Sequence, residues 1–340
     1  MKNKKWIALA AAVVLAVTAL PMGVFAAKKD STEEKLTKVT LNEVAHSIFY
    51  APQYVAIEEG YFAEKGLDLT LVTGFGADKT MTAVISGEAD IGFMGAEASV
   101  YAYQEGATDP VVNFAQLTQR AGNFLVAREE MPDFKWEDLK GEKVLGGRKG
   151  GMPEMVFEYI LKKNGMDPQK DLTIDQSIDF GSTAAAFTSD DSAAYTVEFE
   201  PSATILEKEG AGYVVASLGE ASGYVPYTSY STKASYMKEN PEIIQKFTDA
   251  LQKGMDYVQS HTPEEIAEVI APQFKETDLE TITAIVKRYY DQDTWKENLI
   301  FEKDSFELLQ DILEDAGELT DRTAYENLVQ TEYAQKACKN

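Results

Sequence analysis

The feature that most constrains the fold of this chain is a series of short strand-like segments that alternate with helical segments. The first series contains expected strands and helices at 39–44, 52–64, 67–72, 78–86, 91–94 and 98–104, followed by strands at 111–117 and 124–127. The second series starts at Glu142 and contains a strand at 143–145, a helix at 153–164 and strands at 172–174, 193–197 and 213–216. Strands that alternate with helices are typical of βαβ units and parallel pairing, so we predict an α/β fold.

The C-terminal part has a different pattern, in which helix follows helix from Ser235 onward. Asn240-Pro241-Glu242 is a helix start signal, and apolar residues recur after it at helical spacing. The simplest interpretation of these apolar stripes is that they face a core. With 340 residues, the chain is long enough for about two domains of roughly 100–200 residues each.

The N-terminus has the parts of an export signal. A lysine-rich region over residues 2–5 precedes an apolar, uncharged run over 6–20, and Val24-Phe25-Ala26 provides a cleavage site. We therefore predict a signal peptide at 1–26 and a flexible leader at 27–37, with an uncleaved membrane anchor as the alternative. Because no cysteine lies near this site, we expect a protein exported to the periplasm or cell surface without a lipid anchor on a signal-peptide cysteine.

The composition excludes several classes of function. The formal charge of −24 argues against nucleic-acid binding, which relies on clustered lysine and arginine. The chain has one cysteine, Cys338, which argues against a disulfide framework or a metal site built from thiolates. It has two histidines, His46 and His261, so few side chains could act as a general acid or base near neutral pH. We therefore expect no metal, no cofactor and no catalytic residue.

Candidate ligand-binding residues lie in the loops that follow the expected strands, because ligands of open α/β sheets bind at the carboxyl ends of strands. These loops contain His46, Phe49, Tyr50, Gly76, Ala77, Gly95, Glu97, Gly151, Met152, Glu198 and Glu200. Each has a plain structural alternative: glycines allow tight turns, aromatic rings pack in cores, and carboxylates cap helices or face solvent. Three acids around one cleft would suit a ligand with amino or ring N–H donors.

Other residues point to other chemistry. Arg120 and Arg148 are the candidates for gripping an anion, and Tyr224, Tyr227 and Tyr230 are candidates for the wall of the same cleft. The glycine-rich turn at 146–153 matches no nucleotide-binding pattern, and the chain has no nucleophile-elbow or zinc-protease motif. Two acids could in principle cleave a glycoside, but the pattern is weak support for an enzyme.

Several of these segments together resemble the extracytoplasmic solute-binding proteins of ABC importers. The similar branch includes the nitrate, sulfonate and taurine binders and the pyrimidine-precursor binders of thiamine synthesis. The resemblance rests on the run from Tyr50 to Leu69, on Gly76-Ala77, on Ser86 to Gly92 and on Glu200-Pro201. It extends from about Val39 to Tyr333.

The resemblance implies a two-lobed Venus-flytrap fold, in which each lobe has a central mixed sheet flanked by helices. One lobe would contain 38–121 and 229–340 and the other 122–228, joined by two hinge crossovers. The ligand would be trapped as the lobes close. The candidate residues occupy the positions that line the pocket of family members, and Arg120 is added for the case of an anionic ligand.

The resemblance further implies a monomeric importer component whose partners are a small-molecule ligand and the permease subunits of an ABC transporter. The acids and aromatic residues favour an aromatic heterocycle such as a pyrimidine-type vitamin precursor. A small sulfonate or nitrate-like anion is the alternative ligand. A ligand-sensing protein for a membrane receptor is an alternative role, and a secreted hydrolase is a more distant one. The cysteine-rich motif of the related fungal pyrimidine synthases is absent, which argues against that catalytic branch.

Overall fold

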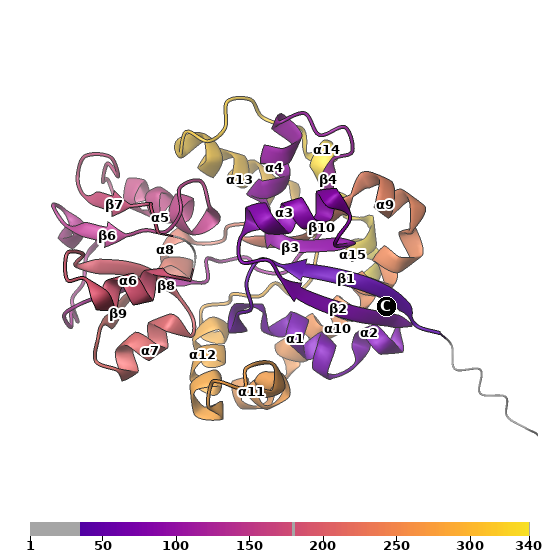
Figure 1. Cartoon of the computed structure of the whole chain (residues 1–340), viewed down its shortest axis with the longest axis horizontal. Coiled ribbons are helices and arrows are strands. Elements are labelled where there is room, and N and C mark those ends of the chain that lie inside the picture. The colour runs from indigo at the N-terminus through magenta and orange to yellow at the C-terminus, as the bar shows by residue number, and fades with distance from the viewer. Residues whose placement is uncertain (1–34, 179–180, 340) are drawn as a thin grey trace, which may run out of the picture. The chain divides into compact units, whose positions relative to one another are not determined.

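Two five-stranded sheets form the centre of the described chain (Figure 1). The structure is a computed structural model that describes residues 35–178 and 181–339. The predicted signal peptide and most of the predicted leader lie outside the described residues. Lys35 onward forms one compact unit that contains both sheets.

The first sheet has the strand order β2-β1-β3-β10-β4. Its strands are β2 (Leu67–Thr73), β1 (Thr37–Glu43), β3 (Ile91–Gly95), β10 (Thr228–Lys233) and β4 (Val111–Gln116). The pairs β1–β2 and β1–β3 are parallel, as the alternation with helices predicts. The late strand β10 lies antiparallel between β3 and β4. The sheet is therefore mixed and contains a strand from a distant part of the chain.

The second sheet repeats this plan with the strand order β7-β6-β8-β5-β9. Its strands are β7 (Thr173–Asp175), β6 (Lys143–Leu145), β8 (Tyr195–Phe199), β5 (Asn123–Ala127) and β9 (Tyr213–Ser217). Strand β6 pairs in parallel with β7 and β8, whereas β5 pairs antiparallel with β8 and β9. The chain passes between the two sheets twice, at residues 117–122 and 218–227.

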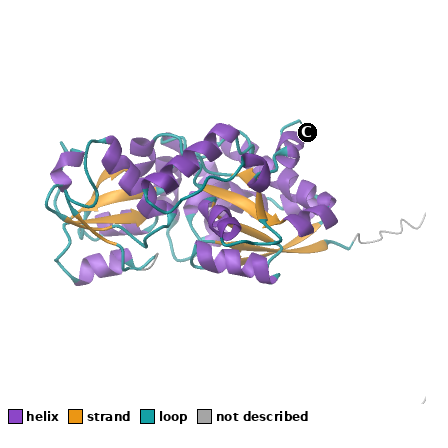
Figure 2. Cartoon of the chain, turned by 90° about the horizontal axis from the view of Figure 1, so that it is seen from above, coloured by secondary structure: helices purple, strands orange, loops and turns teal. Residues whose placement is uncertain are grey.

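Helices cover the faces of both sheets (Figure 2). The helices that accompany the first sheet and the C-terminal part are α1 (Ala51–Glu58), α2 (Tyr61–Glu64), α3 (Ala77–Ser86), α4 (Glu97–Gln104), α9 (Ala234–Glu239), α10 (Pro241–Ser260), α11 (Pro263–Ile270), α12 (Leu279–Asp291), α13 (Lys303–Asp315), α14 (Tyr325–Leu328) and α15 (Glu332–Ala337). Those that accompany the second sheet are α5 (Met152–Lys163), α6 (Thr183–Ser189), α7 (Ser202–Lys208) and α8 (Leu218–Ser222). Short 3-10 helices occupy Ile48–Tyr50, Trp136–Leu139 and Ala271–Gln273.

Local sequence explains where the helices near the site begin and end. Pro52 and Pro153 lie in the first turns of α1 and α5, where the missing amide hydrogen costs nothing. The expected single helix at 52–64 is divided at Gly60, whose φ of 73° is left-handed. In α10, Ile244, Phe247 and other apolar residues at helical spacing are buried, as predicted.

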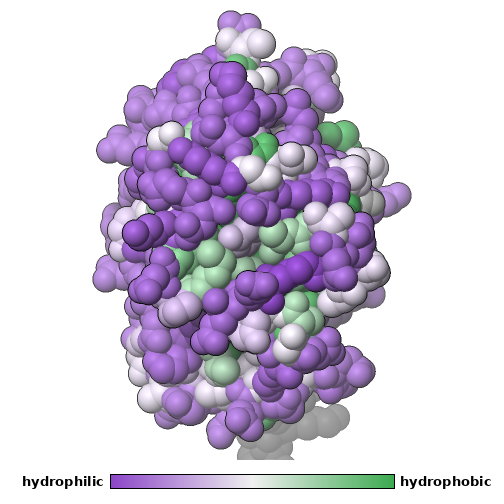
Figure 3. Space-filling model, turned by 90° about the vertical axis from the view of Figure 1, so that its left-hand side faces the viewer, coloured by the Kyte–Doolittle hydropathy of each residue, from purple (hydrophilic) through white to green (hydrophobic). Residues whose placement is uncertain are grey.

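The described surface is mostly polar. The face in Figure 3 is largely hydrophilic, with separate apolar areas between the polar side chains. Among the residues that the structure describes, no helix has the length and apolar character needed to cross a membrane.

Candidate functional site

A cavity of about 490 Å³ lies where loops from both sheets meet. Its walls come from the loops after β1, β2 and β3 of the first sheet and from those after β6 and β8 of the second. Because these are the carboxyl ends of parallel strands, the strand ends bring distant parts of the sequence together. The second crossover also contributes, through Tyr227 and Thr228.

Ten of the twelve residues predicted as ligand-binding line this cavity. They are His46, Tyr50, Gly76, Ala77, Gly95, Glu97, Gly151, Met152, Glu198 and Glu200. The structure therefore places these ten residues together at one cavity.

Phe49 and Arg120 are outside the cavity lining. The Phe49 ring is fully buried among other aromatic rings, and its close contact with Gly122 leaves no room there for a Cβ atom. The Arg120 guanidinium lies 4.3 Å from the centre of the Tyr224 ring, and its Nη1 atom donates to the Gly219 carbonyl at 3.1 Å. Both side chains therefore pack around the crossovers, outside the cavity lining.

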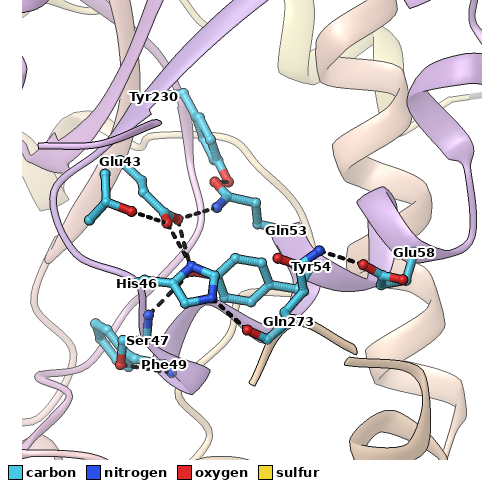
Figure 4. A network of polar contacts seen from close by, with 10 residues as sticks. Glu43, His46, Ser47, Phe49, Gln53, Tyr54, Glu58, Tyr230 and Gln273 are labelled. Atoms are coloured by element: carbon cyan, nitrogen blue, oxygen red, sulfur yellow. Dashed lines mark hydrogen bonds and ion pairs between the residues drawn. The ribbon is translucent and has the colours of Figure 1, made fainter. Parts of the chain in front are cut away.

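His46 lies between two hydrogen-bond acceptors (Figure 4). Its Nδ1 atom is 2.8 Å from Oε1 of Glu43, and its Nε2 atom is 3.0 Å from the carbonyl oxygen of Gln273. Only the protonated imidazole donates from both nitrogens. The hydrogen bond to Glu43 accordingly raises the pKa of His46 above its usual 6.5, against the effect of burial.

The Glu43 carboxylate is completely buried behind His46 and accepts four hydrogen bonds. Besides His46, the donors are the side chains of Gln53, Tyr54 and Thr73. This degree of satisfaction offsets the cost of burying a charge. The network fixes the His46 ring in one orientation at the cavity wall.

Glu97 begins helix α4 and is buried at the cavity, on the side of the first sheet. Its Oε2 atom has no hydrogen-bond partner among the described residues. Burial raises the pKa of Glu97 to about 7, although the charge of Arg148 and the backbone amide of Met152 oppose the shift. Gly95 makes space for this carboxylate, because a Cβ atom at that position would clash with both Glu97 oxygens.

Glu198 is the corresponding acid of the second sheet. It lies in β8, is 3% exposed, and accepts a hydrogen bond of 2.6 Å from the Thr196 hydroxyl. Burial raises the pKa of Glu198 to about 7, against hydrogen bonds from Thr196 and Thr183. Neither Glu97 nor Glu198 forms an ion pair within the described residues.

Glu200 differs from the other two acids because its carboxylate already has partners. Oε1 is 2.6 Å from Nη1 of Arg288 and accepts from the Thr204 hydroxyl, while Oε2 accepts from the Thr204 amide at 3.0 Å. Arg288 also pairs with Glu207 at 3.0 Å. Burial raises the pKa of Glu200, and the charge of Arg288 opposes the shift. This carboxylate links the second sheet to helix α12 and has little capacity left for a ligand.

The loop after β6 brings glycines and one arginine to the cavity. Gly151 precedes helix α5, whose first amides face the loop end, and Arg148 lies 3.9 Å from Asp78 of α3. Such an arrangement can accept negative charge from a ligand. Arg148 is, however, half-exposed at the rim.

Further residues that line the cavity are Phe75, Thr183, Phe199 and Tyr227. Tyr227 was predicted as part of the tyrosine cluster at the wall of the cleft, whereas the other three were not among the predicted ligand contacts. The hydroxyl of Tyr227 is buried without a hydrogen-bond partner in the described chain. Phe75 follows a strand and lies between two glycines, which is a signal that sequence reasoning could have used. Within the described part of the chain, no group of three or more His, Cys, Asp or Glu residues is arranged to hold a metal ion.

Comparisons with known proteins agree with this architecture. Residues 48–266 match the model of the family described as NMT1/THI5 like. The chain is 46% identical over 312 residues to YtlA of Bacillus subtilis, a protein named as a binding protein, with 92% of this chain and 93% of that protein covered. The family predicted from the sequence is thereby confirmed.

Of two more distant relatives, one is named as a binding protein and the other as an enzyme. The riboflavin-binding protein RibY of Chloroflexus aurantiacus is 25% identical over 236 residues, which cover 68% of this chain and 65% of RibY. The 4-amino-5-hydroxymethyl-2-methylpyrimidine phosphate synthase THI11 of Saccharomyces cerevisiae is 24% identical over 225 residues, which cover 62% of this chain and 63% of the synthase.

A solved structure shows the same fold. The alkanesulfonate-binding protein SsuA of Xanthomonas axonopodis pv. citri, bound to MOPS, superposes with a TM-score of 0.70 at 15% identity, with 87% of this chain and 99% of SsuA covered. The chain belongs to the NMT1/THI5-like family and has the two-sheet fold of the periplasmic binding proteins.

Proposed function

We propose that the protein is an extracytoplasmic solute-binding protein that captures a small organic ligand in the cavity and delivers it to an ABC import permease. Family membership, the fold and the position of the cavity between two sheets that the chain links twice support this role. Closure of one sheet unit onto the other around a ligand is a hinge motion. The proposal includes export by the predicted signal peptide and function as a monomer.

We propose an aromatic heterocycle, such as a pyrimidine-type vitamin precursor, as the ligand. The observation that carries this proposal is the pair Glu97 and Glu198, two buried carboxyls that face one cavity from different sheets without an ion-pair partner in the described chain. Oε2 of Glu97 is a buried acceptor without a partner in the described chain, and Glu198 accepts from threonine hydroxyls, so a ligand with amino or ring N–H groups gains by supplying further donors. The aromatic lining residues, such as Tyr50 and Tyr227, provide apolar surface for a ring.

The acids also argue against an anionic ligand. A sulfonate or nitrate in this cavity would face Glu97 and Glu198, whose ionised forms repel an anion, so the anion could bind only if both carboxyls stayed protonated. The features that favour an anion are Arg148 and the start of helix α5, both on the side of the second sheet. An alkanesulfonate-type ligand is therefore the second candidate. A sensor for a membrane receptor would share every feature of the site, and neighbouring permease and ATPase genes would argue against it.

A thermal-shift screen tests the ligand class, because a ligand that binds only the folded state raises the melting temperature by mass action. We expect 4-amino-5-hydroxymethyl-2-methylpyrimidine or riboflavin to raise it in the wild type and to do so much less in Glu198→Gln. Ethanesulfonate and nitrate are expected to have no effect. A shift with ethanesulfonate alone would contradict the proposed ligand class.

The role as a carrier rather than an enzyme has its own test. The recovered ring compound should be chemically unchanged after prolonged incubation with the protein. Turnover that disappears in Glu198→Gln or Glu200→Gln would instead support a hydrolase.

A further inference from the structure

Phe75 occupies an unusual place at the cavity. It is the middle residue of the Gly74-Phe75-Gly76 loop between β2 and α3, it lines the cavity, and 69% of its surface is exposed. Among the described residues, no aromatic ring pairs with it, whereas Tyr50 and Tyr227 of the same cavity pack against neighbouring rings. An exposed phenylalanine that serves only the fold would gain by burial.

The loop is fixed on both sides of Phe75. The Gly74 amide donates to the Glu43 carbonyl at 2.8 Å, and the Gly76 amide donates to the Val44 carbonyl at 3.0 Å. A Cβ atom at Gly74 would lie 2.5 Å from both Asn42 Oδ1 and Thr80 Oγ1, so this glycine allows the close approach to β1. The loop therefore presents Phe75 from a defined backbone position.

The backbone of Phe75 itself is strained. Its φ is 57°, in the left-handed region that glycine and asparagine adopt readily and a bulky side chain does not. Local stability therefore does not explain a phenylalanine here, and neither does burial. Backbone strain of this kind is found at ligand-binding sites, where the surrounding structure enforces it.

We propose that Phe75 determines specificity for a planar ring, by covering the ligand from the side of the first sheet and stacking on it. This inference rests on the proposed function and adds the residue that selects an aromatic over an aliphatic ligand. Arg148 and Asp78, which pair at 3.9 Å between the loop after β6 and helix α3, lie at the same rim. A ring stacked on Phe75 would lie close to the boundary between the two sheets, within reach of residues from both. Ligand binding would therefore favour the closed state, in which one sheet unit has moved onto the other.

The experiment compares Phe75 variants by calorimetry, with riboflavin and 4-amino-5-hydroxymethyl-2-methylpyrimidine as ring probes and taurine as the aliphatic probe. Phe75→Ala and Phe75→Leu should weaken ring binding roughly tenfold or more, in line with alanine substitutions at stacked rings, and Phe75→Tyr should keep it within about threefold. Ile85→Ala removes another exposed apolar side chain, on α3 and outside the cavity lining, and should leave binding unchanged.

Phe75→Gly separates the ring from the backbone. Glycine adopts the left-handed conformation without strain, so Phe75→Gly should melt at or above the temperature of Phe75→Ala and bind ring probes equally weakly. Recovery of ring binding in Phe75→Gly would overturn the proposal, as would unchanged binding in Phe75→Ala. A melting temperature of Phe75→Gly below that of Phe75→Ala would show that the conformation is not strained, which also overturns it.

The outcome for the wild type distinguishes this inference from the proposed function. If the wild type binds a ring probe and Phe75→Ala binds it equally well, only the role of Phe75 is wrong. If the wild type binds taurine and neither ring probe, the proposed ligand class and the role of Phe75 are both wrong.

Discussion

The Nδ1 atom of His46 lies 2.8 Å from Oε1 of Glu43, a carboxylate with no exposed surface. The contact joins a cavity-lining imidazole to a buried acid at the end of β1. The opposite ring nitrogen lies 3.0 Å from the Gln273 carbonyl, so protonation of His46 supplies a donor to each of the two acceptors. Glu97 and Glu198, in contrast, line the cavity without an ion-pair partner among the described residues.

The His46 contact predicts a pKa above 6.5. Because the pKa of His46 is higher in the folded than in the unfolded state, its contact with Glu43 stabilises the fold fully below the unfolded-state pKa of about 6.5. This stabilisation is lost as the pH rises through the folded-state pKa. Proton NMR of the two histidines follows the titration, and His46→Gln identifies the His46 signal. The pKa of His46 should fall in Glu43→Gln. A His46 that titrates below 6.5 in the wild type would contradict the assigned pair.

The raised pKa values of Glu97 and Glu198 predict that the free energy of unfolding falls as the pH rises from about 4.5 to above 7. Over that range the unfolded carboxyls ionise while the folded ones keep their protons, so the folded state binds more protons and loses stability. Glu97→Gln and Glu198→Gln should each stabilise the ligand-free protein at pH 8 by on the order of 1–3 kcal/mol, with little effect at pH 4.5. Urea denaturation at pH 4.5 and at pH 8 measures the free energy of unfolding of each variant. If a Gln substitution changed this free energy equally at the two pH values, the raised pKa values would be contradicted.

Glu200 and Arg288 are predicted to affect stability more than binding. Arg288→Met leaves the buried Glu200 carboxylate without its cation, which should cost about 2–4 kcal/mol of unfolding free energy. Guanidinium denaturation of Arg288→Met, Glu200→Gln and the double variant gives the coupling between the two residues. The matched variant Glu198→Gln should show the reverse pattern, with weakened ring binding and an intact fold. Loss of binding in Glu200→Gln without loss of stability would make Glu200 a ligand contact.

Gly95→Ala is predicted to weaken ring binding without removing any polar group. The added methyl group would occupy the position of the Glu97 carboxylate, which must then turn away. We expect a loss of affinity of roughly tenfold, comparable with the loss of one hydrogen bond to a charged group. Calorimetry on this variant and on Gly106→Ala provides the comparison, because Gly106→Ala strains a left-handed backbone (φ 88°) outside the cavity lining without any atom within 4 Å of the added Cβ, and so tests for a loss of stability alone. Equal affinities in the two variants would show that the Glu97 position does not matter.

The sequence was most informative about strands and the loops after them. The strand expected at 143–145 has the observed bounds, and those at 67–72 and 91–94 each end one residue early. Because parallel strands place their carboxyl ends at one edge, residues as far apart as His46 and Glu198 could be assigned to one cavity. The lobe boundaries at 121–122 and 228–229 and the hinge motion stay predictions.

The features of the fold and of the site that the sequence did not predict depend on contacts between residues far apart in the chain. Strand β10 was not predicted because its alternation is polar and its partners β3 and β4 come from the other end of the chain. Glu200 lines the cavity as predicted, but its ion pair with Arg288 was not predicted, because Arg288 is 88 residues away in a helix whose sequence carries no sign of the pairing. Phe49 and Tyr50 are adjacent and both aromatic, and only the packing around Gly122 decides that Phe49 points into the core.

We propose that Glu97 and Glu198, which form no ion pair within the described residues, select a ring with N–H donors over an anion. Isothermal titration calorimetry of the wild type at pH 7 with 4-amino-5-hydroxymethyl-2-methylpyrimidine, riboflavin, ethanesulfonate and nitrate measures this preference directly. We expect one of the ring compounds to bind at least about 100-fold tighter than either anion, which corresponds to about 2.7 kcal/mol. Tighter binding of ethanesulfonate or nitrate than of both ring compounds would contradict the proposed selection.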